Sequence, residues 1–160
     1  MAHAHLDASV RDLSQRAVLC WLATVSADGQ PNVSPKELFA VVDDDHLVIA
    51  NLASPVSATN IRAEPRVCVS LIDVFVQKGF KLMGHATDIR ADEPEFAQWA
   101  APVLIQAGDR FTVRSVFRVR VQAVTPILAP SYRFYPEQTT EAAQVESALR
   151  AYGVVRPPDR

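Results

Sequence analysis

Alternation of apolar and polar residues predicts that most of this chain is β-structure. Residues 111–124 alternate most regularly and residues 66–74 follow the same pattern, which indicates strands with one face in a core. Residues 17–25 are apolar almost throughout and predict a buried strand. Further strands are predicted at residues 31–42, 46–51 and 79–90.

Short connections join the first three predicted strands. Asp28-Gly29 is a strong hairpin signal, and the acidic run 43–45 predicts a second tight turn. Loops of this length leave no room for a crossover, so an antiparallel meander is expected. Six such strands with apolar residues on both faces tend to close on themselves, because closure removes unpaired edges. The expected fold is mainly β (α+β), a six-stranded antiparallel barrel with short peripheral helices.

Helical periodicity is confined to short segments. Ser54 followed by Pro55 is the usual order at a helix start and predicts a helix over residues 54–64. A first helix is expected at residues 7–17, and another follows Asp92, where Pro102 predicts a kink or a break before Gly108 ends the helix.

The C-terminal part has a different composition. Residues 129–160 hold one predicted helix, residues 140–152. This division gives a barrel domain at residues 1–128 and an extension at residues 129–160. The helix packs on the barrel or on a partner subunit, since it carries an apolar stripe of Ala142, Val145, Leu149 and Tyr152.

Composition excludes several classes of function. Hydrophobic residues make up 49% of the 160 and charged residues 21%, which is typical of a folded domain. The net charge of -2 leaves no excess of cations for a nucleic-acid backbone. The longest apolar run is far too short to span a membrane, and no secretory signal is visible. Cys20 and Cys68 fall in apolar runs, which indicates reduced core residues of a cytoplasmic protein.

Familiar catalytic motifs are absent from the sequence. The five glycines form neither GxGxxG nor a P-loop, and HExxH, paired CxxC and GxSxG do not occur. Any bound phosphate must therefore be held by side chains, ordinary backbone N–H groups or a helix N-terminus.

Two segments combine residues suited to binding an anion. Residues 34–37 place a hydroxyl, a cation and a carboxylate inside a strand. Residues 54–60 place three hydroxyls and an amide at a helix start, where the helix dipole favours negative charge. The alternative is that these Ser and Asn residues are ordinary helix caps.

Histidine and arginine offer weaker candidates. His3 and His5 form an H-x-H pair that binds metal weakly or is a solvated tail, and His46 is expected to be exposed. His85 lies beside Gly84, which marks either the approach of a ligand or an ordinary strand position. An arginine stripe binds an anion or faces solvent or a subunit interface; its members are Arg114, Arg118 and Arg120.

Three sequence blocks in order resemble one known family. ADGQPNVSPKE, then DDDHLVIANLASPVSATNIRAEPRVCVSL, then GFKLMGHATDIRADEPEF are similar to the pyridoxamine 5′-phosphate oxidase-like, FMN-binding split-barrel proteins. The likeness covers residues 18–124, about two thirds of the chain. It implies a six-stranded split barrel, residues 1–128 as an FMN-binding domain, and a homodimer with one FMN in each of two sites at the subunit interface.

The resemblance also implies which residues contact FMN. Ser34, Pro35 and Lys36 would lie against the flavin ring and ribityl chain. Backbone groups of Ala50 and Asn51 would contact the ring edge. The partner's strand would complete the pocket with the residues matching Gly79, Phe80 and Lys81. The phosphate would be held by Ser54, Ser57, Thr59 and Asn60.

The sequence departs from the family's oxidases at two places. Val56 stands where a cation is common, and the C-terminal substrate-binding segment is not recognisable. Oxidation of pyridoxamine phosphate is therefore not expected. The catalytic residues, the substrate and the electron donor stay open.

Two functions remain as alternatives. The first is an FMN-dependent oxidoreductase that passes hydride or electrons between a nicotinamide and a small acceptor. The second is a non-enzymatic protein that binds or senses a flavin, a deazaflavin or haem. An obligate homodimer is expected in either case, because residues 111–124 and 140–152 offer more apolar surface than one barrel covers.

Overall fold

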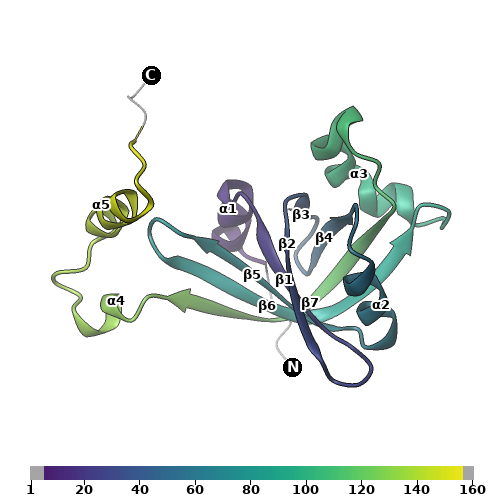
Figure 1. The fold of residues 1–160 in the computed structure, drawn as a ribbon, viewed down its shortest axis with the longest axis horizontal. Helices are drawn as coiled ribbons and strands as arrows, with labels where there is room; N and C mark the ends of the chain where they lie inside the picture. Colours follow the sequence, from purple (N-terminus) through teal and green to yellow (C-terminus); the bar gives the residue numbers. More distant parts are fainter. Residues whose placement is uncertain (1–5, 157–160) are drawn as a thin grey trace.

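Seven strands form one antiparallel sheet in the computed structural model, which describes residues 6–156 (Figure 1). The strands are β1 (Cys20–Val25), β2 (Pro31–Lys36), β3 (Phe39–Val41), β4 (His46–Asn51), β5 (Arg66–Asp73), β6 (Lys78–Arg90) and β7 (Ser115–Leu128). Neighbours in the sheet follow the order β2-β1-β5-β6-β7-β4-β3. The mainly β, antiparallel class predicted from the sequence is confirmed.

The sheet is curled into a half-barrel. β2 and β3 lie at its opposite edges, although only Glu37 and Leu38 separate them in the sequence. The three steps from Lys36 to Phe39 span at most about 11 Å, so the two edges must come close together. Within residues 6–156 no strand pairing joins these edges. The barrel is therefore split along the seam between β2 and β3.

The seam corrects two predictions. Residues 31–42 form two strands instead of one, which raises the strand count from six to seven. The expected meander is also wrong, because β2 pairs with β1 while β3 pairs with β4. The chain therefore changes its pairing partner at the seam, from β1 on one side to β4 on the other. β4 in turn pairs with β7 on its other side.

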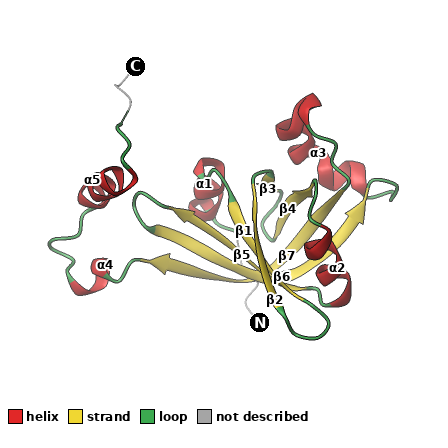
Figure 2. Ribbon diagram, in the orientation of Figure 1, coloured by secondary structure: helices red, strands yellow, loops and turns green. Residues whose placement is uncertain are grey.

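Helices lie around the sheet (Figure 2). The Asp7 side chain caps the first helix by accepting from the Val10 N–H at 3.1 Å. Pro102 lies inside the third helix without breaking it, so the predicted break does not form. The helices are α1 (Ala8–Arg16), α2 (Pro55–Ala63), α3 (Phe96–Ala107), α4 (Ser131–Phe134) and α5 (Glu141–Tyr152), with a 3₁₀ turn at Gly108–Arg110.

Two apolar clusters hold the fold together. The larger fills the barrel, where Leu22 and Phe117 are fully buried. The smaller lies between α3 and the outer side of β4 and β7, with Val48 and Val103 at its centre. β4 is buried on both faces because it separates the two clusters, which explains its unbroken apolar sequence.

The last strand is displaced from its prediction. β7 begins at Ser115 and not at residue 111, because Ser115 pairs with Arg90 and Asn51, the last residues of both neighbouring strands. It runs on to Leu128, opposite Lys78 at the start of β6.

The C-terminal helices pack beside the hairpin between β5 and β6, away from the barrel body (Figure 1). The Tyr132 hydroxyl donates to the Val76 carbonyl at 2.9 Å, and Lys78 pairs with Glu141 at 2.7 Å. The inward residues of β7 are buried inside their own barrel. The inward face of this strand therefore leaves no surplus apolar surface, whereas Tyr152 on α5 is 61% exposed, and the homodimer stays a prediction. Among residues 6–156, no helix has the length and apolarity to cross a membrane.

Candidate functional site

Four polar residues that the sequence singled out meet between β2 and the start of α2. The Ser34 and Ser57 hydroxyl oxygens lie 3.2 Å apart. The Lys36 ammonium donates to the Ser54 hydroxyl at 2.5 Å. Lys36 and Ser57 are buried, with 6% and 1% of their surfaces exposed. The curl of the sheet thus brings a cation and three hydroxyls together at one helix end.

The N-terminus of α2 has no side-chain cap. Ser54 is the N-cap residue, yet its hydroxyl makes no capping bond and accepts from Lys36 instead. Pro55 has no N–H, and the N–H groups of Val56 and Ser57 in the first turn have no partner within the helix by its geometry. Free N–H groups at the positive end of a helix dipole favour an anion.

Asn51 fixes the turn that leads into α2. Its side-chain carbonyl accepts from the Ser54 N–H and its amide donates to the Ser115 hydroxyl, both at 3.0 Å. The Ala50 N–H donates to the Leu38 carbonyl, and the Asn51 carbonyl accepts from the Arg114 N–H. These backbone groups are thus already paired within the chain, and their contact with a flavin ring stays a prediction.

Burial shapes the electrostatics of Lys36. Burial lowers the pKa of Lys36, and the neighbouring Cys20 raises it by a smaller amount. Burial also raises the pKa of the Cys20 thiol to about 12, so this cysteine is an inert core residue. Within residues 6–156 no carboxylate pairs with Lys36. Within the described residues the ammonium is therefore a buried charge that donates to a single hydroxyl, that of Ser54, which favours an added anion.

Asn60 and Thr59 point in different directions. Asn60 is buried and its amide donates to the Thr24 hydroxyl at 3.0 Å, which ties α2 to β1. Thr59 is exposed on the outer side of the helix. The structure does not bring Thr59 to the Ser34–Ser57 pair, and a phosphate contact of either residue stays a prediction.

Thr24 and Asn32 were missed by the sequence reasoning. The Asn32 amide also donates to the Thr24 hydroxyl, at 3.1 Å. A lone threonine inside the apolar run of residues 17–25 was the available signal, because a buried hydroxyl needs a partner.

The segment expected to complete the pocket lies elsewhere in the same chain. Gly79, Phe80 and Lys81 belong to β6, two strands removed from β1 and three from β2. Three strand spacings are roughly 14 Å. One chain therefore does not bring this segment to Ser34, and its supply by a partner subunit stays a prediction.

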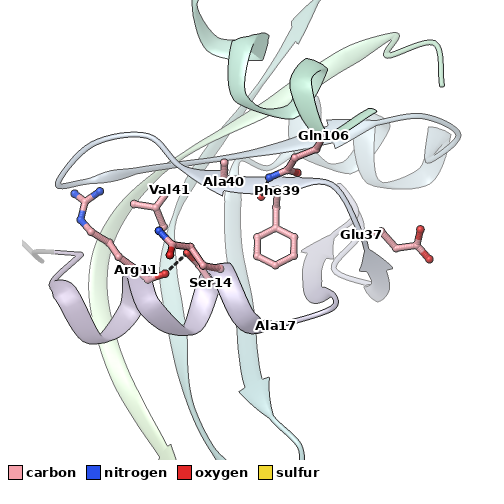
Figure 3. A pocket seen from close by; sticks show the side chains of 9 residues that line it. Arg11, Ser14, Ala17, Glu37, Phe39, Ala40, Val41 and Gln106 are labelled. Carbon is pink, nitrogen blue, oxygen red and sulfur yellow. Dashed lines mark hydrogen bonds between the residues drawn. The ribbon is translucent and has the colours of Figure 1, made fainter. Parts of the chain in front are cut away.

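A separate pocket of about 360 Å³ lies among α1, β3 and α3 (Figure 3). Two of its polar residues are already engaged: Arg11 contacts Asp44 and the Leu6 carbonyl, and Gln106 donates to the Phe39 carbonyl at 3.0 Å. Of the candidate segment 34–37 only Glu37 lines this pocket, so the structure separates its carboxylate from Ser34 and Lys36.

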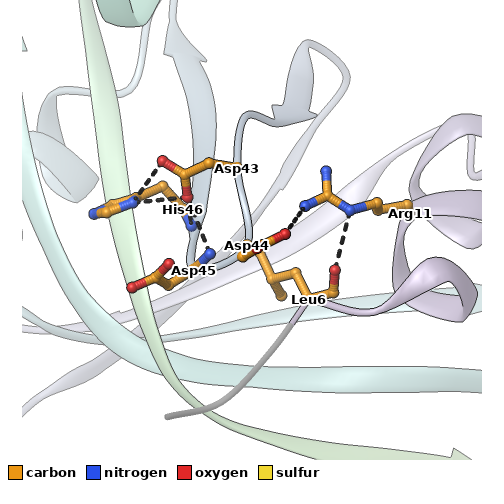
Figure 4. Close-up of polar contacts among 6 residues, drawn as sticks. All are labelled: Leu6, Arg11, Asp43, Asp44, Asp45 and His46. Carbon is orange, nitrogen blue, oxygen red and sulfur yellow. Dashed lines mark hydrogen bonds and ion pairs between the residues drawn. The ribbon is translucent and has the colours of Figure 1, made fainter.

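The turn before β4 gathers Asp43, Asp45 and His46, whose side-chain ligand atoms lie within 4.8 Å of one another (Figure 4). Asp43 already accepts from the His46 ring and from backbone N–H groups, so this arrangement is explained as a turn.

The His46 side chain is 21% exposed and lies against Trp99, which corrects the expectation of an exposed residue. His3 and His5 lie outside the described residues.

Gly84 is explained by the fold. A Cβ at Gly84 would lie 2.0 Å from the Arg120 carbonyl, so the neighbouring strand β7 requires a glycine here. His85 beside it is exposed. No ligand is needed to explain either position.

The structure places the three arginines of the predicted stripe in different surroundings. Arg118 is held by α3, with its guanidinium over the Trp99 ring at 5.0 Å and 3.6 Å from Glu95. Arg120 is exposed on β7, whereas Arg114 precedes the strand and lines a groove beside α2.

The fold and these contacts define a class of protein: a split barrel with an uncapped helix N-terminus and a buried lysine at its seam. The chain belongs to the pyridoxamine 5′-phosphate oxidase family, whose model matches residues 6–127. A search of curated proteins finds no significant match.

Solved structures share the fold at low sequence identity. HupZ from Group A Streptococcus is 21% identical with a TM-score of 0.66, covering 77% of this chain and 94% of its own. An FMN-binding protein from Syntrophomonas wolfei is 11% identical with a TM-score of 0.60, covering 71% and 80%. HutZ, the heme storage protein from Vibrio cholerae, is 20% identical with a TM-score of 0.61, covering 78% and 94%.

Proposed function

We propose that this chain binds FMN, with the phosphate at the N-terminus of α2, and that it works as an oxidoreductase. The observation that carries the proposal is the buried Lys36 ammonium on the Ser54 hydroxyl, beside uncapped N–H groups. FMN carries a doubly charged phosphate, which needs several donors at once. The fold that the chain shares with an FMN-binding protein also supports FMN binding.

Lys36 supplies the cation that Val56 does not. Val56 is 57% exposed on α2 and offers no charge, whereas Lys36 reaches the same helix end from β2. In this proposal Lys36 and Ser57 hold the phosphate, and Ser34 orients Ser57 through their hydroxyl contact. FMN supplies the hydride and electron chemistry when it is bound, and the chain supplies its position and charge environment.

The second half of the site comes from a second copy of the chain. An exposed row crosses the outer face of the sheet from Val33 through Ala23 and Cys68 to Met83. Val33 and Met83 are 60% and 40% exposed, and Trp21 beside the row is 43% exposed. Apolar surface of this kind marks an interface. The row also begins on the edge strand β2, which carries Ser34 on its other face, so a partner seated here covers the strand that bears part of the site.

The dimer has a direct test. Val33→Glu places a charge at the β2 end of the row and is expected to give a folded monomer in sedimentation at micromolar concentration, while the exposed Val155→Glu leaves a dimer. A stable, folded wild-type monomer under the same conditions would contradict the two-chain site.

Haem is the alternative ligand. It is favoured by one observation, the fold shared with HutZ, the heme storage protein. Haem offers carboxylates in place of a phosphate, and these also suit a helix N-terminus.

The absorption spectrum of the purified protein tests the proposal. Flavin bands in the blue and near-ultraviolet, bleached by NADH or NADPH without oxygen, are expected. No pyridoxal phosphate should form from pyridoxamine phosphate, because the phosphate of that substrate needs a second cationic clamp beside the flavin ring. A haem spectrum with no flavin uptake would overturn FMN binding, and a bound flavin that neither nicotinamide bleaches would leave a non-enzymatic binding protein.

A further inference from the structure

A second polar site lies on another face of α2. A groove of about 420 Å³ runs between this helix and the ends of β6 and β7. Pro55, Ala58 and Arg62 form its helix side, whereas Ser57 and Asn60 face β1 and β2. The groove extends to Ser54, so it adjoins the FMN phosphate site at the N-terminus of α2 and continues from there along another face of the helix.

Asp88 is the unusual residue of this groove. Its side chain is only 3% exposed, and its Oδ1 atom has no hydrogen-bond partner within residues 6–156. Its Oδ2 atom lies 3.8 Å from the Arg62 Nε atom, beyond hydrogen-bond distance. Buried acceptors are almost always satisfied by a donor. Asp88 therefore presents an unused acceptor to the groove.

Arginines surround this acceptor. Arg62, Arg90 and Arg114 line the groove together with Asp88, so three arginines share it with one carboxylate. Arg90 lies 3.4 to 3.5 Å from the exposed acids Asp92 and Glu93. Arg114 makes no ion pair in the described part of the chain. The balance of charge favours an anion, and guanidinium groups suit phosphate and carboxylate.

We propose that this groove binds a small anion that also carries a hydroxyl group. The anionic group, a phosphate or a carboxylate, faces Arg114 and Arg62, and the hydroxyl donates to the Asp88 Oδ1 atom. A neutral donor fits better than an ammonium, because the groove already holds more positive than negative charge. The volume lies in the ordinary range of small-molecule sites.

Calorimetric titration with three probes tests the proposal: glycerol 3-phosphate, inorganic phosphate and glycerol. Glycerol 3-phosphate is expected to bind the wild-type protein about tenfold more tightly than phosphate, since one hydrogen bond to a charged acceptor accounts for this factor. Glycerate, tested beside it, distinguishes a carboxylate from a phosphate as the preferred anion. Failure of both hydroxylated anions to bind would overturn the proposal.

Variants locate the site. Asp88→Ala should remove the advantage of glycerol 3-phosphate over phosphate, with Asp88→Asn as a second variant that keeps the side-chain shape. Arg114→Gln should weaken both anions. The exposed residues Asp109 and Arg133 provide the matched controls Asp109→Ala and Arg133→Gln, which should change nothing.

One further variant separates this groove from the FMN site. Lys36→Met should leave glycerol 3-phosphate binding intact, and Asp88→Ala should leave FMN binding intact, so that either claim can fail alone. Loss of glycerol 3-phosphate binding in Lys36→Met would place the probe in the FMN phosphate site beside Lys36 and overturn the proposal. An unchanged affinity in Asp88→Ala would overturn it too.

Discussion

The two faces of α2 differ in how their polar groups are satisfied. Toward β1 and β2, Ser57 contacts Ser34 and Asn60 donates to Thr24, so the buried groups have partners inside the chain. Toward β6 and β7, the Asp88 Oδ1 atom has none within residues 6–156. The first face fixes the helix on the barrel and leaves its N-terminal end free to meet an anion. The second face offers a carboxylate and arginines that the fold itself does not need.

The largest effect is expected at the N-terminal end of α2. Lys36→Met should weaken FMN binding by about tenfold to a hundredfold, the equivalent of losing one or more charge-assisted hydrogen bonds. Riboflavin, which has no phosphate, should keep its affinity. Because the change removes a buried charge, the fold should not lose stability. Fluorescence titration measures both affinities.

A matched cation controls this result. Arg133 is exposed on α4, and Arg133→Met alters charge by the same amount. An equal loss of FMN affinity in both variants would show a general effect of charge rather than a phosphate contact of Lys36.

The second largest effect is expected on the free energy of unfolding, which should respond differently to changes on the two faces of α2. Asn60→Ala removes the bond to Thr24 and should lower the free energy of unfolding by about 1 kcal/mol or more. Asp88→Asn removes a buried charge that has only a long ion pair of 3.8 Å with Arg62, and it should cost nothing or stabilise the fold. Urea unfolding measures both. A costly Asp88→Asn beside a harmless Asn60→Ala would reverse the comparison between the faces.

A smaller effect is expected from pH. The pKa of Lys36 is lowered from its ordinary value of 10.5 by burial, and the ammonium is present only below that lowered pKa. FMN affinity should therefore fall as pH rises, beginning below 10.5, while riboflavin and the Lys36→Met variant lack this component. Over the same window the unliganded fold should gain stability, since the unfolded chain holds the proton more tightly. A flat FMN profile would exclude Lys36 from the phosphate site.

Local signals predicted the start of α2 and most of the strands. Ser54 followed by Pro55 marks the helix start through its own backbone chemistry, and alternation marks β5 through burial of one face. The break between β2 and β3 was not predictable in this way. It depends on pairing with strands at opposite edges of the sheet, which local periodicity does not encode.

The structure brings together four of the residues that the sequence selected as FMN contacts, while their contacts with one another were not predicted. The sequence selected Ser34, Lys36, Ser54 and Ser57, yet the bond from Lys36 to Ser54 depends on the curl of the barrel. Asn60 was selected for its amide, which the structure directs to Thr24. Asp88 gave no signal, because a single acid in a strand is common and only its burial makes it unusual.

Parallel titration of the wild-type protein with FMN and riboflavin tests the central claim most directly. If the phosphate is held at the N-terminus of α2 by Lys36 and Ser57, FMN should bind at least about a hundredfold more tightly than riboflavin, since two charge-assisted bonds supply this factor. Equal affinities for the two flavins would contradict the account.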